Sequence, residues 1–179
     1  GSSHGMALVA VDVDKNEIAS TFIIGDEASS LKVYKTLVDG DYIYAATSAG
    51  ILRADLEAGG LTFYENWKLF SSTAATYCGI QNFAGGIVAV RGEPGSTCLL
   101  QLFRDGEVIS AGSFKNFRNL NRSGSELLVV SQNRIQWLDQ DFSVIRETDD
   151  VNTGEGSYRP DYGDALTSNN GTFWFADND

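Results

Sequence analysis

One unit of strand, glycine turn and strongly apolar strand recurs along the chain, and it constrains the fold more than any other feature. The glycine of the turn falls at positions 40, 85, 124 and 171, in steps of 45, 39 and 47 residues. These steps match the roughly 40–50-residue repeat of β-propeller blades. Glycine suits the turn because tight hairpins need positive φ, which a Cβ atom penalises. The repeat therefore predicts an all-β fold built from propeller blades.

The strand after each turn is apolar almost throughout, in residues 43–46, 87–90, 127–130 and 173–176. A continuous apolar run predicts a strand covered on both faces, whereas strict alternation would predict one face in water. Inner strands of a propeller blade are covered in this way by neighbouring blades. Buried positions are predicted at Ile43, Ala45, Val88, Leu128, Val130, Trp174 and Ala176. Core aromatic residues are predicted at Tyr42, Tyr44, Trp67, Trp137 and Trp174.

Each unit continues into further strands, and the two ends of the chain carry partial units. Third strands are predicted at 51–56, 98–103 and 135–138, and fourth strands at 107–111 and 143–147, with a weaker one near 67–70. A hairpin over 8–24 matches the last two strands of a unit, and 164–177 matches the first two. We predict a β-propeller fragment of three full four-stranded blades plus two half-blades. Residues 8–179 would form part of a larger propeller, and residues 1–7 read as an expression-tag remnant.

The half-blades raise a question of closure, because open sheet edges are liabilities. They can complete one another within one chain, be exchanged between two chains, or stay open in an arc. A single chain would then close with only four blades, which is narrow for a propeller. Burial of the ends in a homo-oligomer is therefore favoured.

Composition excludes several kinds of partner and chemistry. A net charge of −11 argues against nucleic acid, which needs a basic surface, and no apolar run is long enough to span a membrane. The single histidine, His4, lies in the tag remnant, which excludes catalytic triads and histidine-bearing metal sites. The run Asp12-Val13-Asp14-Lys15-Asn16, at the turn of the first hairpin, mimics the opening of a calcium loop, but Glu17 replaces its glycine and Ile23 its final glutamate. We expect no catalytic residues, no metal and no cofactor.

Two cysteines, Cys78 and Cys98, complete the inventory of reactive groups. They can form one disulfide in an oxidising compartment or remain two thiols buried in strands. Buried thiols are favoured, since a free cysteine packs as a small hydrophobe, but geometry decides the question.

Two segments are candidates for ligand or partner binding. The hairpin loop at 91–96 contains Arg91 and Glu93, which either bind a ligand or form a local ion pair. The insert 149–162 does not fit the repeat, and long propeller loops are frequent contact sites. Its mixture of carboxylates, tyrosine and arginine suits a sugar, a peptide or a calcium ion, although it also fits a solvated connection between blades. The candidate residues there are Asp149, Asp150, Tyr158, Arg159 and Asp161.

Two runs resemble blades of bacterial propellers. Residues 42–54 carry Tyr-Ala-Ala-Thr followed by Gly-Ile, and residues 171–177 read Gly-Thr-Phe-Trp-Phe-Ala-Asp. The order of a hairpin over 9–24, the segment 24–30, this blade and Asn66-Trp67 is similar to the N-terminal propeller of the PorZ-like accessory proteins of type IX secretion. This resemblance covers most of residues 8–70, and the remainder resembles generic blades.

The resemblance implies a role without catalysis. It points to a protein of the periplasm or the outer-membrane-associated cell surface of a Gram-negative bacterium. Such a protein assists the secretion sortase and binds a protein partner or a surface glycan. The same blade shape also builds the ligand-sensing periplasmic propellers of hybrid two-component regulators, which is the alternative function.

Overall fold

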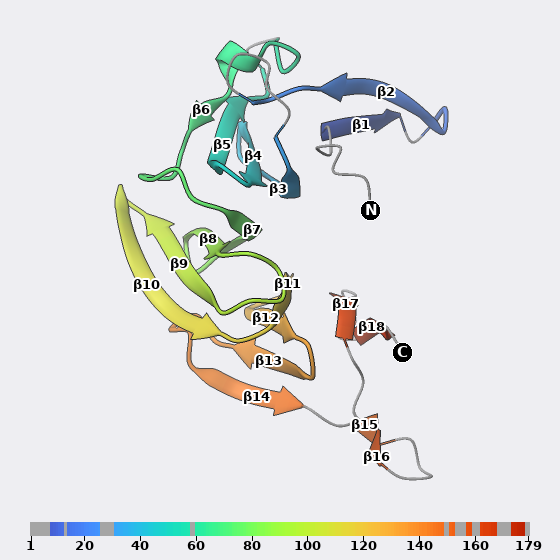
Figure 1. Ribbon diagram of the computed structural model, residues 1–179, viewed down its shortest axis with the longest axis vertical. Helices are drawn as coiled ribbons and strands as arrows, with labels where there is room; N and C mark the ends of the chain where they lie inside the picture. The colour runs from blue at the N-terminus through green and yellow to red at the C-terminus, as the bar shows by residue number, and fades with distance from the viewer. Residues whose placement is uncertain are drawn as a thin grey trace. The chain divides into compact units, whose positions relative to one another are not determined.

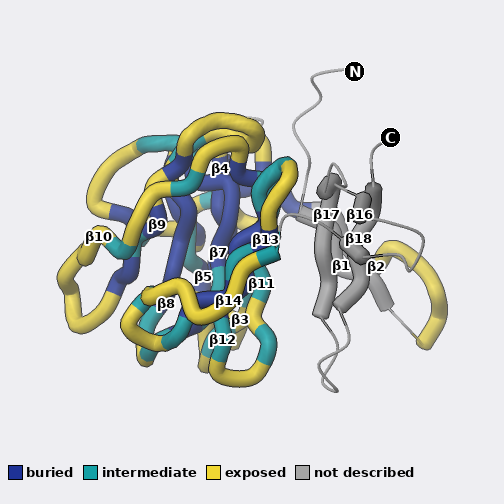
Figure 2. The backbone as a smooth tube through the Cα atoms, turned by 90° about the horizontal axis from the view of Figure 1, so that it is seen from below, coloured by how far each residue is buried: buried dark blue, intermediate teal, exposed yellow. Residues whose placement is uncertain are grey.

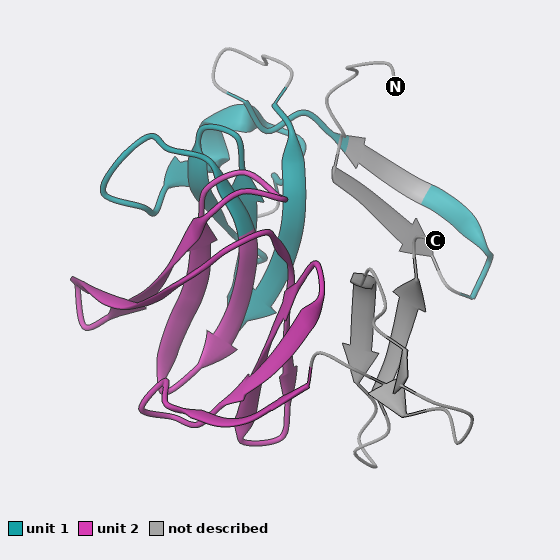
Figure 3. Cartoon of the chain, turned by 60° about the horizontal axis from the view of Figure 1, so that its bottom comes forward, with its two compact units in different colours: residues 1–78 teal, residues 79–179 magenta. Residues whose placement is uncertain are grey.

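The computed structural model describes residues 8–12, 14–25, 31–57, 60–148, 151–152, 157–158, 162–167 and 173–177. The chain forms two compact units, residues 1–78 and residues 79–179 (Figure 3). In the described ranges every regular element is a β-strand, apart from one 3-10 turn at Tyr64–Asn66. No helix in these ranges is long and apolar enough to cross a membrane.

The first unit contains a hairpin and one four-stranded antiparallel sheet in the order β3-β4-β5-β6 (Figure 1). The hairpin strands are β1 (Leu8–Asp12) and β2 (Glu17–Phe22). The sheet strands are β3 (Val33–Asp39), β4 (Tyr42–Thr47), β5 (Gly50–Asp55) and β6 (Lys68–Leu69). Its core cluster comprises Phe22, Ile24, Val33, Ala45, Ala54 and Trp67.

Two more four-stranded meanders form most of the second unit. The first contains β7 (Tyr77–Phe83), β8 (Gly86–Arg91), β9 (Cys98–Arg104) and β10 (Glu107–Phe114). The second contains β11 (Phe117–Ser123), β12 (Glu126–Ser131), β13 (Arg134–Leu138) and β14 (Val144–Thr148). These two sheets pack closely: a Cβ atom on Gly79 would lie 3.2 Å from the Phe117 ring, and the rings of Phe83 and Phe142 meet edge-on at 5.8 Å.

The remaining strands of the second unit form two short hairpins. Strands β17 (Tyr162–Thr167) and β18 (Phe173–Asp177) pair as the C-terminal half-blade. Strands β15 (Val151–Asn152) and β16 (Ser157–Tyr158) pair inside the insert 149–162. The insert was predicted as a non-repeating segment, and its described residues form two pairs, Val151 with Tyr158 and Asn152 with Ser157.

The meander of four antiparallel strands is the blade of a β-propeller, so the predicted fold class is confirmed. The predicted turn glycines adopt the positive φ that favours glycine: Gly40, Gly85 and Gly124 have φ of +57°, +73° and +58°. A Cβ atom at any of the three would meet open space, so the backbone angle alone favours glycine there. Gly171 lies outside the described residues.

Burial follows the order of strands in each blade (Figure 2). Second strands are buried: Ala45, Val88, Leu128 and Val130 are fully inaccessible to solvent. Outer strands are wet, and most residues of β10 and β14 are exposed. Strand β6, which is the fourth strand of the first blade, has only two residues, in line with its weak sequence signal.

Two burial predictions on β4 are wrong. Ile43 is only half-buried and Tyr42 is 36 % exposed, whereas Tyr44 is 6 % exposed. Ile43 packs against the core cluster of the first unit but is only partly covered, although Ile87 and Leu127 at the equivalent positions are buried. Tyr42 is covered by the guanidinium of Arg53, 4.5 Å from its ring centroid. The predicted burial of Trp67 and Trp137 is confirmed, and the side chains of Trp174 and Ala176 lie outside the described part of the chain.

Candidate binding site on the rim of the second unit

Three connections of the second unit meet at one end of its sheets. They are the loop 92–97 between β8 and β9, the turn 115–116 between β10 and β11, and the turn 132–133 between β12 and β13. Gly95 N–H donates to the Phe117 carbonyl at 2.7 Å, and Phe117 N–H donates to the Ser96 carbonyl at 3.2 Å. Gln132 N–H donates to the Asn116 carbonyl at 3.0 Å. These backbone hydrogen bonds join the three connections into one structure, here called the rim.

A buried thiol shapes the first of these connections. The thiol of Cys98 donates to the Glu93 carbonyl at 3.2 Å, and the Ser96 hydroxyl donates to the same oxygen at 2.7 Å. Gly92 has φ of +136°, and a Cβ atom there would lie 2.8 Å from the Cys98 sulfur. Cys78 and Cys98 form no disulfide and both are buried, so the favoured prediction of two buried thiols is confirmed.

The rim contains a pocket of about 430 Å³ between the second and third connections. Ser113 and Phe114 contribute the end of β10, and Arg134 and Gln136 contribute β13. The pocket, here called the rim pocket, is lined by Ser113, Phe114, Lys115, Asn116, Ser131, Gln132, Asn133, Arg134 and Gln136. Its described lining holds amides, hydroxyls and two cationic side chains but no carboxylate, in a chain of net charge −11.

The two cationic side chains of the pocket, Arg134 and Lys115, differ in their ionic partners. The guanidinium of Arg134 lies 3.6 Å from a carboxylate oxygen of Glu147, which also accepts a hydrogen bond from the Gln136 amide at 3.1 Å. Lys115 is exposed and takes part in none of the ion pairs found within the described residues. The rim pocket therefore offers the ammonium group of Lys115 and the side-chain amides of Asn116 and Gln132 to a ligand that brings acceptor atoms.

The residues predicted from the sequence are only partly brought together. Arg91 ends β8 opposite Leu99, and Glu93 lies in the next loop; both are exposed on the rim, but neither lines the rim pocket. The other candidates belong to the insert. Asp149, Asp150, Arg159 and Asp161 lie outside the described residues, as does the side chain of Tyr158 at the end of β16.

Sequence reasoning missed Lys115, Asn116 and Arg134. A signal was available, because the polar runs 115–116 and 132–134 each follow a predicted strand. In an antiparallel meander, the second-to-third connection and the link to the next blade emerge at the same end of the sheet. That topological step would have placed the two runs side by side.

The first unit has a pocket of a different character. Its volume is about 530 Å³, and it is lined by Ile24, Leu31, Ala49, Leu52, Tyr64, Glu65, Trp67, Lys68 and Leu69. The walls are mostly apolar, as expected beside a fourth strand of two residues that leaves Leu69 half-exposed. Within the described parts of both units, no three His, Cys, Asp or Glu side chains gather as metal ligands would.

No protein-family model matches this sequence, and no curated protein matches it. Solved structures are similar in fold. PorZ, an essential bacterial surface component of the type IX secretion system of Porphyromonas gingivalis, aligns with 82 % of this chain at 16 % identity and a TM-score of 0.58. The extracellular domain of the hybrid two-component system BT4673 of B. thetaiotaomicron aligns with 96 % of the chain at 13 % identity and a TM-score of 0.62. Hsv2 of Kluyveromyces lactis aligns with 98 % at 12 % identity and a TM-score of 0.56.

The chain spans 18 % of the length of PorZ, 24 % of that of the BT4673 domain and 54 % of that of Hsv2. At identities of 12–16 % such similarity shows the fold and not the activity. The chain has the fold of β-propeller blades.

Proposed function

We propose that this chain is a non-catalytic binding and scaffolding module that assists type IX protein secretion and the secretion sortase at the bacterial cell surface. Two observations support the proposal. The blade and hairpin motifs of residues 8–70 resemble those of PorZ-like accessory proteins. PorZ itself, a surface component of that system, shares the fold over 82 % of the chain.

The structure of the rim supports the proposed binding role. Its three connections are tied by backbone hydrogen bonds, which hold the exposed Arg91, Glu93 and Lys115 on a rigid base. A rigid base lowers the entropy lost when a partner binds. The partner would be the secretion sortase, another surface component or a surface glycan, met in the periplasm or at the outer-membrane-associated surface.

The absence of catalysis is part of the proposal. The one histidine of the chain, His4, belongs to the segment that reads as a tag remnant. We expect the purified protein to show no turnover of polysaccharides in hydrolase and lyase assays. A measurable rate that disappears on substitution of a carboxylate of this chain would contradict the proposal.

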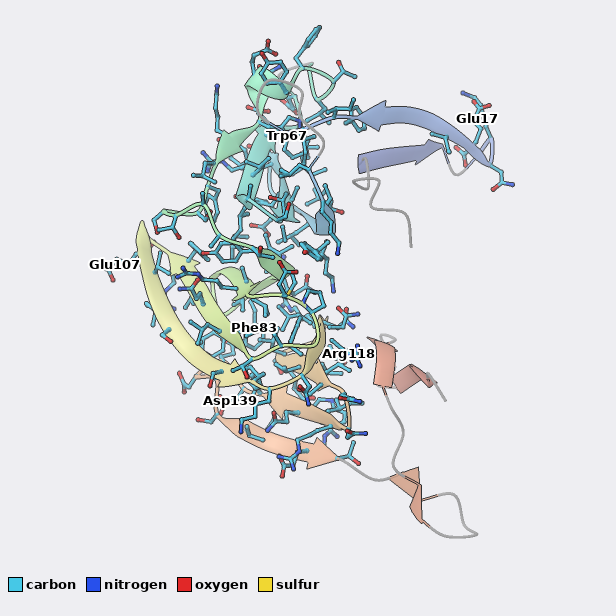
Figure 4. All side chains as sticks on the ribbon, viewed as in Figure 1. Glu17, Trp67, Phe83, Glu107, Arg118 and Asp139 are labelled. Carbon is cyan, nitrogen blue, oxygen red and sulfur yellow. The ribbon has the colours of Figure 1, made fainter. Side chains whose placement is uncertain are left out.

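The role in secretion is tested in the bacterium that encodes the full-length protein. Deletion of the gene should abolish surface attachment of secreted proteins, and the Arg91→Ala/Glu93→Ala variant should lower it several-fold at unchanged protein level. Asp41→Ala is the matched control, because Asp41 is an exposed carboxylate in the turn between β3 and β4 of the first unit, whereas Arg91 and Glu93 belong to the second unit. Glu107 is not used, because it projects into solvent from the start of β10, the strand whose other end reaches the rim (Figure 4). Normal secretion after complete deletion would refute the role.

A second function is favoured by a specific observation. The BT4673 extracellular domain shares the fold over 96 % of the chain, which supports a ligand-sensing periplasmic propeller of a hybrid two-component regulator. In that case deletion would change the transcription of a defined set of genes while secretion stays normal. The same deletion strain therefore separates the two proposals.

A further inference from the structure

The rim pocket adjoins a free strand edge. Strand β10 is the outermost strand of its sheet, and within the described chain it pairs on one side only, with β9. Its last two residues, Ser113 and Phe114, form a wall of the pocket. The unpaired backbone groups of β10 therefore lead directly to the donor-rich pocket.

Residues along β10 provide apolar contacts on both faces. Val108 and Ile109 are 41 % and 40 % exposed, and they point to opposite faces because side chains alternate along a strand. Leu99 of β9, opposite Ser113, is 44 % exposed beside the pocket wall. An extended chain paired along the free edge of β10 would lie beside Val108 and Ile109, whereas Leu99 lies one strand further in.

A bulge separates the pairing edge from the pocket. The register of β10 on β9 shifts between Ser110 and Gly112, and Gly112 has φ of +146°. Bulges redirect the side chains that follow them and are frequent beside binding sites. Here the redirected residues are Ser113 and Phe114, the ones that line the pocket.

We propose that an extended peptide binds along β10 as an additional strand and places a carboxylate group in the rim pocket, near Lys115. This inference rests on the proposed binding function and names the ligand class of the rim. A free strand edge presents alternating N–H and C=O groups that a second extended backbone pairs with in register, which argues for a peptide over a saccharide. A pocket with an ammonium group, amide donors and no carboxylate in its described lining suits an anionic acceptor. The carboxylate comes either from the peptide's C-terminus or from an acidic side chain.

Strand β14 provides the internal comparison. It is also an outer strand with exposed apolar residues, Val144 and Ile145 at 48 % and 52 %. None of its residues lines the rim pocket. Of these two outer strands of the second unit, β10 is the one that joins exposed apolar side chains to the rim pocket.

The test begins with random heptapeptide libraries, one displayed with free C-termini and one with internal peptides, selected on the 179-residue protein. Enriched peptides are synthesised as acids, as C-terminal amides and with Asp or Glu changed to Asn or Gln. We expect binding to weaken about tenfold when the carboxylate is removed and similarly in Lys115→Gln, as for loss of one charge-assisted hydrogen bond. Loss in the amide identifies a C-terminal carboxylate; loss in the Asn or Gln peptide identifies a side chain.

Controls separate strand pairing from simple charge attraction. A peptide with alternate backbone nitrogens methylated should lose binding, because it cannot pair with β10. Lys68→Gln, an exposed lysine of β6 in the first unit, should bind the peptide normally.

Three results would overturn the inference: no enriched peptide, peptide binding unaffected by Lys115→Gln, or Lys115-dependent binding of uronic-acid oligosaccharides on a glycan array in place of peptides. These readouts use purified protein, so the secretion assay on the Arg91/Glu93 variant still judges the proposed function separately.

Discussion

Single residues in the loop 92–97 show how local chemistry builds the rim. Gly92 is required twice, by a φ of +136° that a side chain rarely adopts and by contact with the Cys98 sulfur. Gly95 in the same loop has φ of +79°, but a Cβ atom there would meet nothing within 4 Å. A comparison of substitutions at Gly92 and Gly95 therefore separates the cost of backbone strain from the cost of a steric clash.

We expect Gly92→Ala to lower the free energy of unfolding by about 3 kcal/mol, the sum of a strained backbone and an overpacked contact. Gly95→Ala adds only the positive-φ penalty, about 1 kcal/mol. Urea denaturation followed by tryptophan fluorescence measures both. Equal losses in the two variants would contradict the close packing of Gly92 on Cys98.

The two thiols give a second prediction at this scale. Cys78 is 7 % and Cys98 0 % exposed, and no disulfide joins them. Because a thiol must reach the reagent to react, the native protein should react slowly with a thiol-specific reagent, and the protein unfolded without reductant should react at both cysteines. Fewer than two reactive thiols after unfolding would indicate a disulfide.

At the scale of elements, the order of strands in a blade decides which residues stabilise it. Residues 127–130 of β12 are fully buried, whereas residues 144–147 of β14, two strands away, are exposed. The apolar run in second strands predicted this burial, because a strand covered on both faces has no polar side. It failed at Tyr42 and Ile43, although Ile87 and Leu127 at the positions equivalent to Ile43 are buried, because an apolar run does not record how far the surrounding chain covers each strand.

Leu128→Ala should destabilise the protein by about 2–5 kcal/mol, because it opens a cavity in a strand without solvent contact. Leu99→Ala removes the same atoms from a side chain that is 44 % exposed. Its cost should be about 1 kcal/mol or less. The comparison is read from the urea midpoints of the two variants, and a loss at Leu99 as large as that at Leu128 would argue against the outward orientation of Leu99.

At the scale of the whole molecule, the hairpins β1–β2 and β17–β18 each form a sheet of only two strands. A two-stranded sheet is marginally stable unless another strand or surface covers it. Blades in a propeller satisfy this need within the ring. Strand β17 already lies beside β11 and β12, and each half-blade still lacks the two strands that would complete a four-stranded blade.

We expect the purified chain to self-associate through its half-blades. Light scattering of a dilute sample should give a mass above the 19.4 kDa of one chain, and charged substitutions on the two hairpins should reduce it. A monomer of 19.4 kDa that melts in one cooperative transition would refute this expectation.

The sequence by itself determined the blades. Turn glycines and continuous apolar strands follow from local requirements, so both can be recognised in the sequence. The positive φ of Gly40, Gly85 and Gly124 agrees with the turns predicted there. Only the tertiary structure decided the rim pocket, because its walls come from the separate segments 113–116 and 131–136. It also decided the role of Cys98, whose contact with the Glu93 carbonyl depends on how the loop folds back. Contacts between segments distant in sequence leave no local pattern, since each segment alone reads as an ordinary polar turn.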